Sequence, residues 1–168
     1  LDLPGPVYIR LGKGGDPVVS RDEDGFEIGR AIELRGGADV AIVATGVMVG
    51  RALDAAEILA GKGIQCTVVN MHTVKPIDRA KILELAQRFG LIVTLEEHTV
   101  IGGLGSAVAE VLVDEFTGKM PQLKRLGIPD SFPSQYGSQD SLLEYFGLQP
   151  DTIAAAVAAH AASSAAAE

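Results

Sequence analysis

Apolar runs of strand length recur along the chain and are separated by segments with helical spacing. The clearest run is VAIVA at residues 40–44, which ends in a Thr-Gly turn. Continuous apolar runs of this length are typical of strands that are buried on both faces of a sheet. The same pattern predicts five strands, at residues 31–34, 40–44, 64–71, 91–95 and 123–128.

Amphipathic helices are predicted between these strands. Residues 49–60 repeat apolar side chains at helical spacing, and residues 106–116 do the same after a glycine-rich turn. Pro76 and Asp78 open a further helix that closes at Gly90. Each helix therefore follows one strand and precedes the next.

Two more helices are predicted towards the C-terminus. Ser138 or Asp140 can cap a short helix that ends at Gly147. Asp151 begins an alanine-rich helix, whose small side chains offer little surface for packing. We expect this helix to fray beyond His160 and residues 161–168 to form a disordered tail.

Strands that alternate with helices at this spacing indicate βαβ units, and right-handed crossovers place helices on both faces of such a sheet. We predict an α/β fold with three layers (αβα) around a mostly parallel, five-stranded sheet. Aliphatic side chains must fill its core, because hydrophobic residues make up 47% of the 168 residues while aromatic residues make up only 5%.

Net charge, hydropathy and cysteine content indicate which partners and which cellular compartment to expect. The formal net charge of −8 disfavours nucleic-acid binding, because an acidic surface repels phosphate backbones. No apolar run approaches the roughly 20 residues of a membrane span, and the single cysteine, Cys66, has no partner for an intramolecular disulfide. We expect a cytoplasmic protein with no membrane contact and a buried, unreactive Cys66.

The first 30 residues have a different character. An apolar run at residues 7–11 precedes three glycines and predicts a strand followed by a flexible loop, whereas the polar residues 17–30 resemble a linker. The chain opens on Leu1 in an extended segment, which is typical of a piece cut from a longer polypeptide, although processing would look the same.

One glycine-rich turn is a candidate binding site. Gly102, Gly103 and Gly105 stand just before a predicted helix, whose free N–H groups can bind an anion. The spacing matches neither a dinucleotide fingerprint nor a Walker loop, and Glu96 and Glu97 lie directly upstream, where they would oppose an anion. We therefore favour a tight strand-to-helix turn over an anion site.

Other candidate groups do not form a catalytic set by themselves. Glu96, Glu97 and His98 are possible acids and bases, but consecutive side chains on an extended segment point in opposite directions. The three histidines are scattered without metal-ligand spacing, so no metal site is expected. Lys13, in a glycine-rich loop, can reach a ligand, although a solvated lysine is the simpler interpretation.

Several segments together resemble the transketolase family of thiamine-diphosphate enzymes. Residues 5–13 are similar to the last strand of the pyrimidine-binding domain of transketolases and 1-deoxyxylulose-5-phosphate synthases. Segments similar to their C-terminal domain are residues 39–46, 68–78, 94–108, 127–130 and 147–148. The order and spacing of these segments carry the resemblance, which covers nearly the whole chain except the alanine-rich tail.

The resemblance implies domain boundaries for the chain and a location for the cofactor site. Residues 1–16 would end a preceding pyrimidine-binding domain, 17–30 would be a linker and 31–160 would form the C-terminal domain. Thiamine diphosphate and Mg²⁺ bind in the full enzyme through motifs that this sequence lacks. The chain alone is therefore expected to bind no cofactor and to be inactive, with no catalytic residue of its own.

The resemblance also implies partners and two candidate roles. Lys13 matches the position of an arginine that binds the sugar phosphate, although lysine lacks the bidentate fork of arginine. The segment containing Glu97, His98, Gly102, Gly103 and Gly105 would contribute to a subunit interface. Expected partners are an N-terminal subunit or upstream domains of the same enzyme, further copies of the chain in a dimer or other homo-oligomer, and sugar phosphates as substrates.

Three functions remain open from the sequence. The first is the C-terminal domain of a transketolase-like transferase, which moves a two-carbon ketol unit between sugar phosphates and in which this domain serves assembly. The second is the corresponding domain of a 2-oxoacid dehydrogenase beta subunit. The third is a stand-alone regulatory module that holds an anion at the glycine-rich turn.

Overall fold

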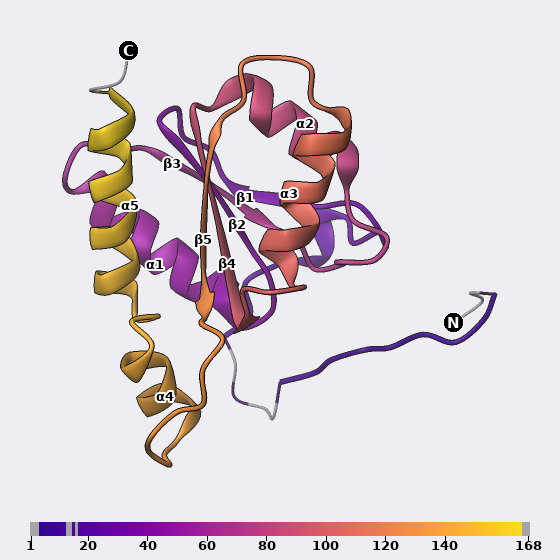
Figure 1. Cartoon of the computed structure of the whole chain (residues 1–168). Helices are drawn as coiled ribbons and strands as arrows, with labels where there is room; N and C mark the ends of the chain where they lie inside the picture. Colours follow the sequence, from indigo (N-terminus) through magenta and orange to yellow (C-terminus); the bar gives the residue numbers. More distant parts are fainter. Residues whose placement is uncertain (1–3, 13–14, 16, 166–168) are drawn as a thin grey trace.

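Five strands and five α-helices make up the chain in the computed structural model, which describes residues 4–12, 15 and 17–165 (Figure 1). The strands are β1 (Ile32–Arg35), β2 (Val40–Ala44), β3 (Cys66–Asn70), β4 (Leu91–Thr99) and β5 (Gln122–Ile128). The helices are α1 (Met48–Ala60), α2 (Arg79–Arg88), α3 (Leu104–Glu115), α4 (Gln139–Tyr145) and α5 (Pro150–Ala165), and a short 3-10 helix, η1, spans Asp22–Asp24.

The strands form one sheet in the order β1-β3-β2-β4-β5. All neighbouring pairs from β3 to β5 are parallel, and only the edge strand β1 runs antiparallel, against β3. The predicted five-stranded, mostly parallel sheet is therefore confirmed. The central strand β2 is buried along its whole length, as its unbroken apolar sequence predicts.

Helices cover both faces of the sheet, so the predicted three layers are also confirmed (Figure 1). Alternate residues of each strand face opposite sides: Ile42 packs with α1 and α5, whereas Ala41 and Val43 pack with α2 and α3. The core is aliphatic on both sides. Phe89 is the only aromatic residue among the buried hydrophobic side chains of the described residues.

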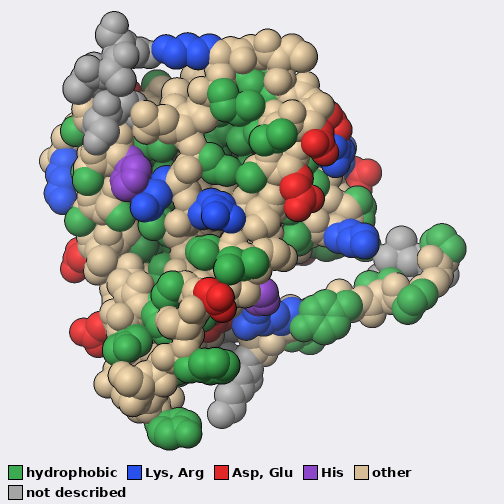
Figure 2. Space-filling view, in the orientation of Figure 1, with side chains coloured by type: hydrophobic (Ala, Val, Ile, Leu, Met, Phe, Trp, Pro, Cys, Tyr) green, Lys and Arg blue, Asp and Glu red, His purple; other side chains and the backbone are tan. Residues whose placement is uncertain are grey.

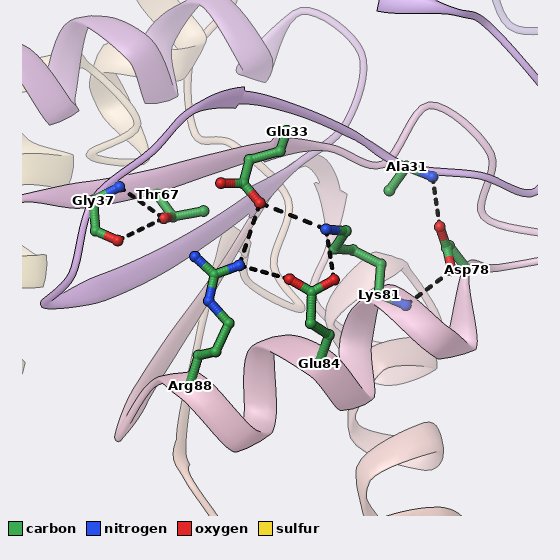
Figure 3. Close-up of polar contacts among 8 residues, drawn as sticks. All are labelled: Ala31, Glu33, Gly37, Thr67, Asp78, Lys81, Glu84 and Arg88. Atoms are coloured by element: carbon green, nitrogen blue, oxygen red, sulfur yellow. Dashed lines mark hydrogen bonds and ion pairs between the residues drawn. The ribbon is translucent and has the colours of Figure 1, made fainter.

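Polar contacts tie the antiparallel edge strand β1 to α2 (Figure 3). The carboxylate of Asp78 accepts hydrogen bonds from the N–H of Lys81 (2.9 Å) and from the N–H of Ala31 (2.8 Å), so it caps α2 and also fixes the start of β1. Glu33 on β1 pairs with Lys81 (3.5 Å) and Arg88 (3.4 Å) on α2. These contacts help to hold a four-residue edge strand, which has strand pairing on one side only.

The predicted strand at residues 7–11 does not form. These residues are exposed and belong to no sheet, and the segment from residue 4 to 12 runs away from the domain as an extended arm (Figure 1). A strand requires a neighbour that supplies backbone hydrogen bonds, and no strand of the described chain pairs with the arm. The segment predicted as a linker, residues 17–30, contains η1 and an isolated bridge between Glu27 and Arg30.

The ends of one strand and one helix lie several residues beyond the prediction. Strand β4 continues through Thr99, so Glu96, Glu97 and His98 belong to the strand and not to a loop. Helix α5 continues to Ala165, past the point at which fraying was expected, so residues 161–165 are helical. No helix in the described part of the chain combines the length and the apolarity needed to cross a bilayer.

Candidate functional site

The carboxyl ends of β2 and β4 mark the position where an open α/β sheet usually binds its ligands. The connection from β2 leads through α1 to β3 on one side, and that from β4 leads through α3 to β5 on the other. Such a reversal between adjacent strands leaves a crevice at their carboxyl ends. The segments at this end include Thr45-Gly46 and residues 96–103, which contain most of the candidate residues from the sequence.

A buried carboxylate occupies the N-terminus of α3. Glu96 is 1% exposed. Its Oε2 accepts a hydrogen bond from the N–H of Leu104 (2.7 Å), and its Oε1 accepts one from the N–H of Gly105 (2.9 Å). The two N–H groups belong to the first turn of α3, which has no side-chain cap at Gly103. Glu96 therefore supplies both the acceptors and the negative charge that this helix end favours.

Glycines provide the space for the Glu96 side chain. A Cβ atom at Gly103 would lie 1.8 Å from Glu96 Oε2, and one at Gly127 would lie 3.0 Å from Glu96 Cγ. At Gly105, a Cβ atom would lie 2.7 Å from Thr94 Oγ1 and 2.8 Å from Arg125 Cδ. The glycines before and inside α3 thus allow the strand, the turn and the helix to approach one another closely.

The structure does not support an external anion at this turn. The N–H groups that would bind the anion already donate to Glu96, and an anion beside that carboxylate would meet a like charge. The loop is also closed by its own contacts, because Ser106 Oγ (3.1 Å) and Arg125 (3.0 Å) both donate to the carbonyl oxygen of Val100. Gly102, Gly103 and Gly105 form a self-capped turn.

Glu97 points to the opposite side of the sheet and joins two segments that are distant in sequence. Its Oε1 accepts a hydrogen bond from Gln139 Nε2 (2.6 Å) at the start of α4. Its Oε2 lies 3.5 Å from the Arg10 guanidinium, which also donates to the Glu97 carbonyl oxygen (3.4 Å). The N-terminal arm and α4 therefore meet at one carboxylate, as expected for consecutive side chains of a strand that face opposite sides.

A second polar cluster attaches α4 to α1. The guanidinium of Arg51 donates to the carboxylate of Asp140 and to the side-chain oxygen of Gln149. The hydrogen bond from Arg51, with a further one from Gln149, lowers the pKa of Asp140 below its usual value. Contacts from β4 and α1 thus converge on the first turn of α4.

The remaining candidates lie apart in the structure or outside its described residues. His98 is exposed and its Nδ1 contacts the carbonyl oxygen of the next residue, Thr99 (3.1 Å). Cys66 is fully buried, and burial raises the pKa of its thiol to about 11, so it is present as an unreactive thiol. Lys13 lies outside the described residues.

The described residues do not fit a thiamine-diphosphate and metal site. No group of three His, Cys, Asp or Glu side chains within the described part of the chain could hold a metal ion. The N-terminus of α3, which follows the glycine-rich turn, is already occupied by the carboxylate of Glu96. What the carboxyl end of the sheet offers is a set of contacts for holding segments of polypeptide together.

Comparison with known proteins decides the family. The family model described as "Transketolase, C-terminal domain" matches residues 29–153, which is most of the chain. The chain belongs to the transketolase C-terminal domain family. A solved structure described as a split gene transketolase, an inactive beta4 tetramer, has a TM-score of 0.84 and 47% sequence identity, over 92% of this chain and 50% of that one.

Curated relatives of this transketolase C-terminal domain are longer than the chain itself. It is 49% identical over 144 residues to a 6-deoxy-6-sulfo-D-fructose transketolase subunit of a Clostridium species, covering 86% of this chain and 44% of the relative. It is 43% identical over 156 residues to a 1-deoxy-D-xylulose-5-phosphate synthase of Heliobacterium modesticaldum, covering 92% of this chain and 24% of the relative. The chain spans less than half the length of either relative. These likenesses favour the transketolase interpretation over a 2-oxoacid dehydrogenase beta subunit.

Sequence reasoning missed the contacts made by Arg10, Arg51 and Gln139. Their partners lie 42 to 98 residues away along the chain, so no local pattern could reveal them. One signal was available for Glu96: an acidic residue at the end of an apolar strand, followed by glycines before a helix, can turn inward to cap that helix.

The cap predicts the effect of removing Glu96. Glu96→Ala leaves two buried N–H groups without an acceptor, so the free energy of unfolding should fall by about 2–4 kcal/mol. Glu96→Gln keeps one acceptor oxygen and should cost less. Urea denaturation measures both. Glu110→Gln, on the exposed side of α3, is the matched control and should change stability by less than about 0.5 kcal/mol. Equal midpoints for Glu96→Ala and Glu110→Gln would disprove the cap.

Proposed function

We propose that this chain is the assembly domain of a thiamine-diphosphate-dependent, transketolase-like transferase that moves a two-carbon ketol unit between sugar phosphates. The family match over residues 29–153 is the observation that supports this function most strongly. The relative named as a transketolase subunit supports ketol transfer, and the relative named as a 1-deoxy-D-xylulose-5-phosphate synthase supports phosphorylated sugars as the substrate class. The chain contributes packing surfaces to this enzyme, and the reacting groups come from other polypeptide.

Thiamine diphosphate and Mg²⁺ would be held by an N-terminal subunit or by upstream domains of the same enzyme. The self-capped turn at Glu96 and the lack of a metal-binding group within the described residues support this assignment. The cofactor would supply the carbanion chemistry of ketol transfer. We also propose a cytoplasmic location within carbohydrate metabolism, since a lone buried cysteine suits a reducing compartment.

Self-association is part of the proposal. The structural relative with 47% identity is described as a beta4 tetramer, and a dimer is the simplest closed assembly of one chain. The exposed apolar residues of the arm, Tyr8 (88% exposed) and Leu11 (82%), are the kind of surface that an assembly covers. Glu97 holds this arm near α4.

The function is tested by ketol transfer from a ketose phosphate to an aldose phosphate, with thiamine diphosphate and Mg²⁺ present. We expect turnover by the complete enzyme and none by this chain alone. Turnover by the chain alone would contradict the role of an assembly domain. Acyl transfer from a 2-oxoacid to a lipoyl carrier, without ketol transfer, would instead support the dehydrogenase.

Lys13 is proposed to bind the substrate phosphate in the complete enzyme. Removing one hydrogen bond to a charged group costs roughly 1.5–3 kcal/mol, so Lys13→Ala should raise the KM for a phosphorylated sugar about tenfold or more. The circular dichroism spectrum should stay unchanged. Lys13→Arg keeps the charge and adds a bidentate fork, so its KM should not rise. An unchanged KM for Lys13→Ala would exclude the role.

Glu97 is proposed to support the subunit interface by holding the arm and α4 in place. Glu97→Lys removes the acceptor for Gln139 and repels Arg10, so it should lower the assembled fraction measured by light scattering. Glu110→Lys makes the same charge change on the exposed side of α3 and should leave the mass as it is. Identical masses for both variants would argue against the role of Glu97.

A further inference from the structure

The loop between β5 and α4, residues 129–137, exposes two aromatic side chains completely. Phe132 is 98% exposed and Tyr136 is fully exposed. Aromatic residues are only 5% of this chain, so two of them on one nine-residue loop are a marked concentration. In Figure 2, hydrophobic side chains project at the end of the molecule where Figure 1 places this loop.

The loop is held in place although its aromatic side chains are free. Ser134 Oγ lies 3.3 Å from the hydroxyl of Tyr145 on α4, which ties the middle of the loop to that helix. Ser138 caps α4 by accepting a hydrogen bond from the N–H of Ser141 (3.2 Å). A Cβ atom at Gly137 would lie 2.1 Å from Ser141 Oγ, so the loop passes close to the helix at its end.

Helix α4 is in turn fixed to the domain on two sides. Gln139 donates to Glu97 on β4, and Asp140 accepts from Arg51 on α1. An aromatic pair carried by a loop with both ends fixed loses little conformational freedom when it is covered. Rigid aromatic anchors of this kind supply much of the binding energy in protein interfaces.

Charge indicates what can cover the loop. Asp130 is the one charged residue of the loop, and residues 131–138 contain no Asp, Glu, Lys, Arg or His, whereas the whole chain has a formal net charge of −8. Two copies of so acidic a chain repel each other over most of their surface, and a neutral aromatic patch is where they can approach. Val113 on α3 is also 76% exposed, but it is flanked by Glu110, Asp114 and Glu115, which would repel a second copy.

We propose that residues 129–137 form a contact between two copies of this chain, with Phe132 and Tyr136 as its anchors. The contact is isologous, so the same loop of each copy faces its counterpart across a two-fold axis. This inference rests on the self-association proposed above and assigns it to a surface. Because the acidic copies repel, added salt should strengthen the contact by screening that repulsion.

Sedimentation equilibrium of the whole chain over a range of concentrations tests the contact. The double variant F132S/Y136S should raise the dissociation constant for self-association at least about tenfold, the effect of losing hot-spot anchors. Val113→Ser removes another exposed apolar side chain, on α3 (76% exposed), and should leave the dissociation constant unchanged. Circular dichroism confirms that both variants fold.

A thiol cross-link provides the second measurement. The native Cys66 is fully buried, so Ser131→Cys introduces the single accessible thiol of the described chain beside Phe132. Mild oxidation should produce a disulfide-linked dimer of Ser131→Cys and none of the parent chain. Failure to form this dimer, while the chain self-associates, would overturn the isologous contact.

The outcomes separate this inference from the proposed function. A parent chain that stays monomeric at all concentrations would refute both the self-association and the loop contact, without touching ketol transfer by the complete enzyme. A parent chain that self-associates as strongly as F132S/Y136S would refute the loop contact alone. The loop contact would also be refuted if F132S/Y136S self-associates normally and loses only its binding to the N-terminal subunit.

Discussion

The carboxyl end of the sheet depends on a buried carboxylate bound by two backbone N–H groups. The side chain of Glu96 on β4 turns towards α3 and accepts from the first turn of that helix, and two glycines, Gly103 and Gly127, leave room for it. Burying a charge is costly unless it is fully bonded, and here the helix end supplies both the donors and a favourable field. Strand, turn and helix are thereby fixed to each other by one side chain.

Two consecutive residues of β4 make polar contacts on opposite faces of the sheet. Glu96 caps α3 on one face, and Glu97 binds both the N-terminal arm and α4 on the other face. A position that often holds a ligand in α/β folds is used here for internal and segmental contacts. This use agrees with the assembly role proposed above for the chain.

Local pattern was enough to predict the sheet, but not the contacts at its edge. Strand β2 was predicted at its observed bounds because five consecutive apolar residues have few alternatives. Helix α3 begins at Leu104, before the expected Ser106, because Glu96 provides the cap that a serine or aspartate would otherwise supply. The strand predicted at residues 7–11 does not form for another reason: a strand needs a neighbouring strand, and none of the described strands pairs with these residues.

The alanine content of the last helix has a mechanical consequence. Helices α1 and α5 lie against each other, and the fully buried side chains in their shared core include Ala52, Ala55 and Ala56 of α1 and Ala154 of α5. Small residues let two backbones come close, yet each removes little apolar area from water. Local unfolding should therefore begin with the separation of α5 from α1. This would expose the aliphatic side chains on that face of the sheet, while α2 and α3 stay packed on the other face.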